Sequence, residues 1–103
     1  MAVQITDENI KDVLLKNKIT LITFSAPWCG PCRMLAPIID ELHNDNDGIT
    51  IGKVNIDENS ETTSNYNVMG VPTLIFFKYG KEVDKIVGVT SKSAIQAKIN
   101  VLK

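Results

Sequence analysis

The chain places its only two cysteines three positions apart, in the run "APWCGPCRM" over residues 26–34. A structural staple is one reading of Cys29 and Cys32, but in the chain-entropy model a bridge closing so short a loop contributes only about 2 kcal/mol. A metal site is another, but structural zinc takes four Cys or His ligands and the chain adds only His43. Redox chemistry is the third and the one we favour, because thiols at i and i+3 of a helical turn can open and close a disulfide with little backbone movement.

Thiol–disulfide exchange needs a thiolate, and the N-terminus of a helix stabilises one. A cysteine at a helix N-terminus has a lowered pKa, because the first-turn N–H groups and the macrodipole stabilise its negative charge. Cys29 meets this condition, and Cys32 lies one turn deeper. We therefore expect Cys29 to attack a substrate disulfide and Cys32 to resolve the mixed disulfide. Arg33 either supports the thiolate or is an ordinary solvated helix residue.

A strand and a helix must position this pair. The segment 19–26 is β-branched and mostly apolar, as expected of a strand covered on both faces. From Pro31 onward apolar residues recur at helical spacing, and Pro37 should kink the helix. The apolar positions expected on its buried side are Met34, Leu35, Ile38, Ile39 and Leu42.

The rest of the sequence predicts further elements around this unit. A strand at 49–57 should lie parallel to the first one, since a helix connects them. Two strands within 70–88 should form an antiparallel hairpin with its turn at Tyr79-Gly80, so that the sheet is mixed. We also expect a helix over 7–16 with Thr6 as N-cap, a weak helix over 60–66, and a last helix from Thr90 or Ser91 that turns Ala94, Ile95, Ile99 and Leu102 inward.

Length and charge restrict the class of protein. At 103 residues the chain fits one domain, 1–103, with a core that needs no staple. Eleven Lys and Arg against twelve Asp and Glu give a net charge of −1 with no basic run, so we expect no nucleic-acid partner. We find no signal-peptide pattern and no apolar run that could span a bilayer. These features predict a cytoplasmic protein without membrane attachment, and a reducing cytoplasm would keep a thiol pair available.

Several motifs together resemble the thioredoxin family over essentially the whole chain. Cys-x-x-Cys alone is a weak signal, but the complete set in this order and spacing is specific. The set comprises "WCGPC" at 28–32, Pro37, "KVNIDEN" at 53–59, "GVPT" at 70–73, "FFKYGK" at 76–81 and "VG" at 87–88.

The resemblance implies an α/β protein with the thioredoxin fold, a central mixed sheet flanked by helices on both faces. It implies a cis bond at Val71-Pro72, with the backbone of Val71 offered to an extended substrate strand. It also implies a docking surface made of Trp28, Gly30, Pro31, Gly70, Val71, Pro72, Gly88 and Val89. A monomer with no bound cofactor or metal is expected, carrying electrons to oxidised protein substrates and recycled by a thioredoxin reductase that uses NADPH.

The sequence departs from the family beneath the redox pair. The family usually has a buried aspartate at the position of Thr23, near a lysine that matches Lys53, and commonly a tryptophan at the position of Ser25. A threonine hydroxyl cannot act as a base near neutral pH. Resolution by Cys32 should then rely on water, Lys53 or the leaving thiolate. The alternative is that another carboxylate, such as Asp57 or Glu58, takes the place of the missing acid.

The function we expect is a general protein-disulfide reductase and electron carrier, chemically a thiol–disulfide oxidoreductase. One alternative is a binding module that uses the same docking surface and does not need its cysteines. Another is a carrier dedicated to one partner, since Thr23 and Ser25 depart from the usual pattern. An oxidase or isomerase is a third, because the residues around the cysteines set the redox poise.

Overall fold

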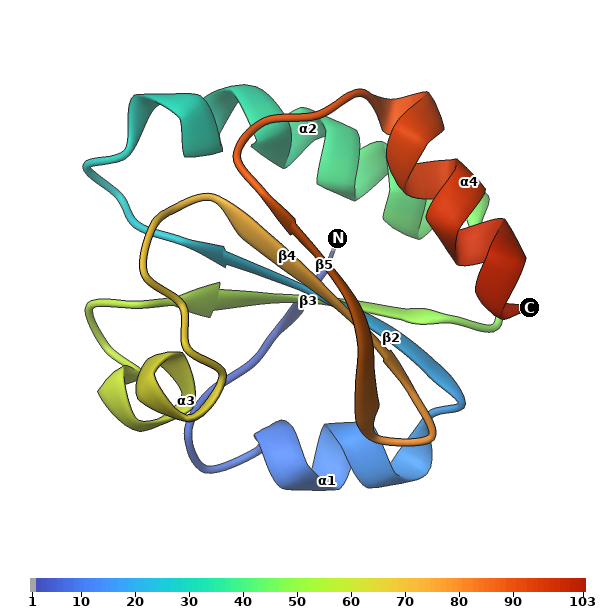
Figure 1. Cartoon of the computed structure of the whole chain (residues 1–103), viewed down its shortest axis with the longest axis horizontal. Helices are drawn as coiled ribbons and strands as arrows, with labels where there is room; N and C mark the ends of the chain where they lie inside the picture. The colour runs from blue at the N-terminus through green and yellow to red at the C-terminus, as the bar shows by residue number, and fades with distance from the viewer. Residues whose placement is uncertain (1) are drawn as a thin grey trace.

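A five-stranded mixed sheet lies at the centre of the computed structural model, which describes residues 2–103 (Figure 1). The strand order is β1-β3-β2-β4-β5. Strands β1, β3 and β2 run parallel, and β4 and β5 are antiparallel to their neighbours. In chain order the elements are β1 (Val3–Gln4), α1 (Ile10–Lys16), β2 (Ile19–Ser25), α2 (Gly30–Asp45), β3 (Thr50–Asn55), α3 (Ser60–Asn65), β4 (Thr73–Lys78), β5 (Lys81–Val87) and α4 (Lys92–Leu102).

The helices cover both faces of the sheet, as expected (Figure 1). Helices α2 and α4 lie on one face, over a cluster formed by Leu21, Leu35, Ile39, Leu42, Ile51, Leu74, Phe76, Ile95 and Ile99. Helices α1 and α3 lie on the other, over a cluster formed by Ile5, Leu14, Ile22, Phe24, Val54, Ile75 and Phe77. The parallel β2–β3 pair and the β4–β5 hairpin confirm the predicted mixed sheet.

Three expectations about local structure are wrong. The first helix begins at Ile10 instead of residue 7, after a turn over residues 7–9 in which Thr6 and Asn9 bond reciprocally: the Thr6 N–H donates to Asn9 Oδ1 (2.8 Å) and the Asn9 N–H donates to Thr6 Oγ1 (3.2 Å). Met34 is 70% exposed, because the buried stripe of α2 runs one position away. Ala94 of α4 is exposed. Strand β1 was not predicted, since two residues carry no pattern.

The face of the sheet beneath α2 changes character along β2. Leu21 and Ile51 are neighbours in the β2–β3 register and belong to the apolar cluster under α2. Two steps further along, Thr23 pairs with Lys53, and Ser25 then pairs with Asn55. Because side chains alternate along a strand, all of these point to the same face. The sheet therefore becomes polar where it passes beneath the start of α2.

Candidate active site

The two cysteines form a disulfide at the N-terminus of α2, with their Cα atoms 5.3 Å apart. Cys29 is the N-cap residue, and its Sγ accepts a hydrogen bond from the Cys32 N–H at 3.2 Å. Pro31 occupies the first turn, where its missing donor costs no helical hydrogen bond. The bridge is shielded: Cys29 is 5% exposed and Cys32 is 7% exposed. A sulfur held in this way has a donor for the negative charge of a thiolate.

The segment before β4 lies against Cys29. The Val71-Pro72 bond is cis, which confirms the expectation from the resemblance. The Val71 carbonyl oxygen lies 3.7 Å from Cys29 Sγ, and Val71 packs against the cysteines. Gly88 is bonded to the same segment: its N–H donates to the Pro72 carbonyl at 2.8 Å. Its backbone φ of 93° favours glycine. Sequence positions more than forty residues apart thus meet at one sulfur.

The residues expected to form the docking surface differ in how far they are exposed. Trp28 is 64% exposed, and its Nε1–H donates to Asp57 Oδ2 at 3.0 Å. Gly70 anchors the loop that carries the cis bond, since its carbonyl accepts from Thr73 Oγ1 at 2.6 Å. The other members whose side chains or backbone are exposed are Gly30, Pro31 and Val89. Pro72 is buried, and Val71 and Gly88 are half-buried.

A lysine–aspartate pair lies beneath α2, on the same face of the sheet as Thr23. Thr23 is buried, and its neighbour in the β2–β3 register is Lys53. The Lys53 ammonium lies 3.2 Å from Asp40 Oδ1, and both side chains are partly shielded from water. Sequence reasoning missed Asp40. Its signal was present, because positions 32, 36 and 40 fall on one side of a helix.

The two carboxylates suggested as replacements for the missing acid are engaged elsewhere. Asp57 accepts the Trp28 hydrogen bond, and Glu58 Oε1 accepts from Asn55 Nδ2 at 3.2 Å. Arg33 is exposed, and its Nη2 donates to the Pro27 carbonyl at 2.9 Å. Among the described residues, the carboxylate that pairs with Lys53 is that of Asp40, and not that of Asp57 or Glu58.

A hollow of about 380 Å³ opens beside Cys32, which we name the Cys32 hollow. It is lined by Gln4, Ser25, Ala26, Pro27, Cys32, Arg33, Ala36, Lys53 and Asn55. Cys32 belongs to this lining and Cys29 does not. Val71 thus lies next to Cys29, and the hollow lies next to Cys32.

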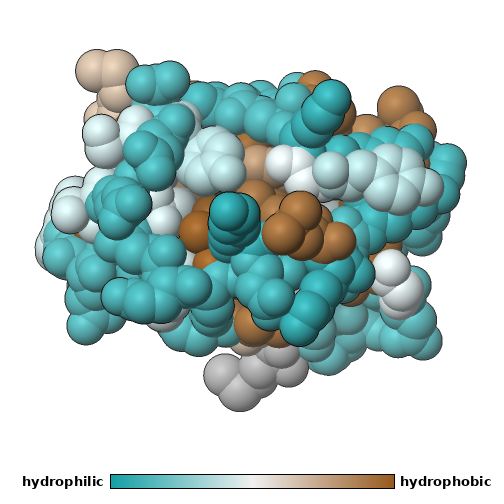
Figure 2. Space-filling model, turned by 90° about the horizontal axis from the view of Figure 1, so that it is seen from below, coloured by the Kyte–Doolittle hydropathy of each residue, from teal (hydrophilic) through white to brown (hydrophobic). Residues whose placement is uncertain are grey.

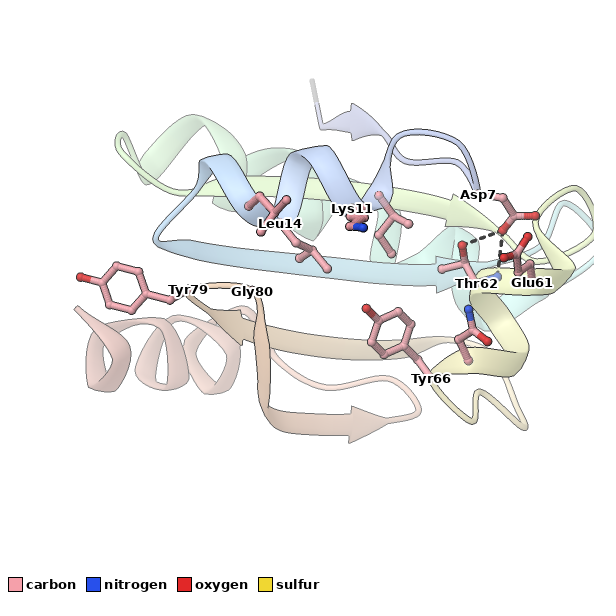
Figure 3. Close-up of a pocket in the computed structure, with 11 residues that line it drawn as sticks. Asp7, Lys11, Leu14, Glu61, Thr62, Tyr66, Tyr79 and Gly80 are labelled. Atoms are coloured by element: carbon pink, nitrogen blue, oxygen red, sulfur yellow. Dashed lines mark hydrogen bonds between the residues drawn. The ribbon is translucent and has the colours of Figure 1, made fainter.

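A second hollow, of about 450 Å³, lies between α1, α3 and the β4–β5 turn, on the other face of the sheet. Figure 2 shows this side of the molecule, where apolar side chains gather among hydrophilic ones. Figure 3 shows Asp7 bonded to Thr62 at one end, and Tyr79 and Gly80 at the other. Asp7 Oδ1 accepts from the Thr62 N–H (2.8 Å) and hydroxyl (2.6 Å). Asp7 therefore attaches α3 to the segment before α1.

Two ionisable residues of this second hollow, Asp7 and Tyr66, have pKa values shifted by their structural surroundings. The hydrogen bond from the Thr62 hydroxyl lowers the pKa of Asp7. Burial raises the pKa of Tyr66, with a further contribution from the nearby Glu82, and the Tyr66 ring stacks edge-on against Phe77 at 5.3 Å. The residues lining this hollow include neither cysteine. The redox pair and the larger hollow are therefore separate features.

Within residues 2–103, no group of three or more His, Cys, Asp or Glu side chains is arranged to hold a metal ion. None of the helices described is both long enough and apolar enough to cross a bilayer.

Comparisons with known proteins agree with the geometry of the cysteines. The Thioredoxin family model matches residues 1–101. The chain is 46% identical over 96 residues to a thioredoxin of Chlamydia pneumoniae, covering 93% of each chain. It is 42% identical over 96 residues to a thioredoxin of Alicyclobacillus acidocaldarius, covering 92% of this chain and 91% of the relative. The solved structure of a mutant thioredoxin from Halobacterium salinarum superposes with a TM-score of 0.93 at 34% identity, over 98% of this chain and 89% of that one.

The fold and these relatives define the class of protein as a thiol–disulfide oxidoreductase. The chain belongs to the thioredoxin family, and it has the thioredoxin fold. Its cysteines keep the Cys-Gly-Pro-Cys spacing, whereas Thr23 and Ser25 lie where the resemblance leads one to expect an aspartate and a tryptophan.

Proposed function

We propose that this protein reduces disulfides of other proteins, with Cys29 as the nucleophile and Cys32 as the resolving thiol. The observation that carries the proposal is the position of Cys29, which caps α2, accepts the Cys32 N–H and lies beside the Val71 carbonyl. A thiolate at this position is stabilised by the helix N-terminus and stands next to a backbone that an extended peptide could pair with.

The reaction has two exchange steps. The Cys29 thiolate attacks one sulfur of the substrate disulfide, forms a mixed disulfide and releases the other substrate sulfur as a thiolate. Cys32 then attacks Cys29 Sγ, which closes the Cys29–Cys32 disulfide and releases the second substrate thiolate. Two electrons pass from the dithiol to the substrate, and each released thiolate takes up a proton from solvent or from Cys32.

The residues around the pair have supporting roles in this proposal. The substrate binds to a surface formed by Trp28, Gly70, Val71, Pro72, Gly88 and Val89. Gly30 lets the substrate backbone approach closely, and Pro31 stiffens the turn. Thr23 cannot serve as a base. Lys53, which lines the same hollow as Cys32, favours the negative charge that forms on Cys32 during resolution.

The proposal extends to the partners and setting of the protein. It acts as a single domain, residues 1–103, and as a cytoplasmic monomer. It binds no cofactor and is returned to the dithiol by a thioredoxin reductase at the expense of NADPH. The family membership supports this recycling.

Single-cysteine variants test the assigned roles. Cys32→Ser retains the nucleophile but cannot resolve, so it should accumulate a mixed disulfide with an oxidised protein substrate such as insulin. Cys29→Ser should accumulate far less, because its remaining thiol is the deeper one. Mass spectrometry of the trapped species distinguishes them. Trapping mainly by Cys29→Ser would reverse the roles, and full turnover by the double variant would support a binding module.

A further inference from the structure

We infer that Asp40 is a positioning residue for the redox pair, which holds the Lys53 ammonium away from the cysteines and so keeps the dithiol a strong electron donor. The inference rests on the proposed function, since it concerns the redox equilibrium of the same two cysteines. It is carried by the ion pair that joins α2 to β3 and by the hollow that Lys53 and Cys32 both line.

The Asp40 carboxylate meets Lys53 on the inner side of α2. Its Oδ1 lies 3.2 Å from the Lys53 ammonium, and the Asp40 and Lys53 side chains are 38% and 27% exposed. Oδ1 itself is out of contact with solvent and accepts no hydrogen bond of good geometry from the described residues. The pair is therefore held by the attraction of its charges, without an aligned hydrogen bond.

Asp40 lies on the same side of α2 as Cys32, but two turns further along. Positions 32, 36 and 40 follow the i, i+4 spacing, so Cys32 and Asp40 are separated by about 12 Å along the helix axis. Salt largely screens a partly exposed charge over that distance. The direct effect of the Asp40 carboxylate on the cysteine sulfurs is therefore small, and its influence passes through Lys53.

Lys53 can act on the redox pair where Asp40 cannot. Its ammonium stands at the end of a flexible four-carbon chain, so its place is set by the group with which it pairs. Lys53 and Cys32 line the same hollow, which gives the chain room to move. A charge acts on a sulfur through the electric field, and the sulfur need not be open to the hollow. The pair with Asp40 directs the ammonium towards the later turns of α2 and offsets its charge.

The position of this cation influences which redox form is favoured. Reduction of the bridge adds two electrons and produces a thiolate at the start of α2. A nearby cation stabilises that thiolate and therefore the reduced form, which makes the pair a weaker electron donor. Thr23, the neighbour of Lys53 on β2, has no charge with which to offset the ammonium. Asp40 therefore limits the effect of Lys53 on the equilibrium.

The experiment measures the redox equilibrium of the full-length chain with dithiothreitol at about pH 8, where the reduced pair has a thiolate. Alkylation of free thiols followed by mass spectrometry counts the reduced and oxidised protein. We expect Asp40→Asn to shift the equilibrium constant towards the reduced protein by roughly twofold to fivefold at low salt, and the shift to shrink at high salt. Asp40→Glu keeps the carboxylate and should remain close to wild type.

A double variant tests whether Asp40 acts through Lys53. Lys53→Met alone should shift the constant modestly towards the disulfide, because it removes the cation. Asp40→Asn should then have little further effect in the Lys53→Met background. Equal effects of Asp40→Asn in both backgrounds would show that the carboxylate acts directly, and would overturn the positioning role.

Asp45→Asn is the matched control for the loss of an ion-paired carboxylate from α2. Asp45 pairs with Lys92 at 2.7 Å, and neither residue lines the Cys32 hollow. We expect its equilibrium constant to equal that of wild type. A shift as large as that of Asp40→Asn would mean a general effect of charge and would overturn the inference. Asp40→Ser, which also removes the charge, replaces Asp40→Asn if circular dichroism shows the latter to be unfolded.

The same measurement separates this inference from the proposed function. A wild-type protein that equilibrates reversibly with dithiothreitol, and an Asp40→Asn variant whose constant is unchanged or shifted towards the disulfide, would overturn the role of Asp40 alone. The absence of any reversible equilibrium in the wild type would overturn the redox function itself.

Discussion

The two faces of strand β2 are built from alternating residues of one short segment, yet they differ at the end that reaches the active site. On the α1 and α3 side, Ile22 and Phe24 are fully buried among apolar side chains. On the α2 side, Leu21 is followed by Thr23 and Ser25, whose neighbours on β3 are Lys53 and Asn55. The first face stabilises the sheet as far as the redox turn. On the second face, a polar hollow lined by Ser25, Cys32 and Lys53 takes the place of part of the apolar core.

The largest expected difference between the faces is in packing. Phe24→Ala should lower the free energy of unfolding by about 3–5 kcal/mol, because it leaves a cavity in a close-packed core. Ser25→Ala, one residue away on the polar face, should change it by less than about 1 kcal/mol, since Ser25 is only half-buried. Urea denaturation of the oxidised proteins measures both. Equal losses would mean that the two faces contribute alike.

A buried acid should be tolerated differently on the two faces. Thr23→Asp should not raise the urea midpoint at neutral pH and should cost about 1–3 kcal/mol, because a buried carboxylate is desolvated although Lys53 lies beside it. Thr20→Asp is the matched control. Thr20 is also buried in β2 but pairs with Phe77, so this variant should lose more free energy of unfolding than Thr23→Asp does. A clear rise in the midpoint of Thr23→Asp would contradict this account.

The same Thr23→Asp variant also tests the chemistry. With threonine at position 23, the pH–rate profile for resolving mixed disulfides should lack the contribution of a titrating carboxylate at that position. Introducing the aspartate should therefore change the shape of the profile. Superimposable profiles would show that position 23 has no kinetic effect.

Asp7 lies at the margin of the apolar face, and we expect it to affect the stability of the fold and not the redox chemistry. The hydrogen bonds from Thr62 lower the pKa of Asp7 below its ordinary value of 3.8. A carboxyl with a lowered pKa stabilises the fold above its unfolded pKa, and the contribution is lost as pH falls through the folded pKa. The stability advantage of the wild type over Asp7→Asn should be complete above about pH 5 and shrink below about pH 4. A gap that widens on acidification would contradict the assignment.

The smallest expected effect is at the rim of the docking surface. Asp57→Asn weakens the hydrogen bond to Trp28, which is exposed, so the free energy of unfolding should change by less than about 1 kcal/mol. Trp28 fluorescence should change more clearly, because its indole loses a charged neighbour. Glu8→Gln, far from Trp28 in the sequence and exposed, is the control for a general charge effect. A large loss of stability would mean that the bond is part of the core.

Patterns in the sequence predicted what depends on local chemistry. The apolar strand before Trp28, the helix after it and the hairpin at Tyr79-Gly80 all have residue types typical of their structures, and all are present. The cis bond at Pro72 came from the resemblance alone, since a single sequence does not distinguish cis from trans before proline. Met34 was misplaced because helical spacing fixes a stripe only to within about one position.

The polar hollow could not be predicted, because it depends on contacts between elements. Lys53 was expected near position 23, but its pairing with Asp40 required the placement of α2 over β3. Ser25 indicated a missing large side chain, and only the structure shows that a hollow is present beside Cys32. Side-chain pairings between distant segments follow from the fold and are not encoded in a local pattern.

The central claim is that Cys29 and Cys32 form a reversible redox pair that donates electrons. A titration of Trp28 fluorescence across thiol/disulfide buffers tests it most directly, because the indole precedes Cys29 and should report opening of the bridge. We predict one reversible two-electron transition, at a midpoint more reducing than the glutathione pool. A more oxidising midpoint would contradict the reductase and favour an oxidase or isomerase, and no transition would contradict a redox role altogether.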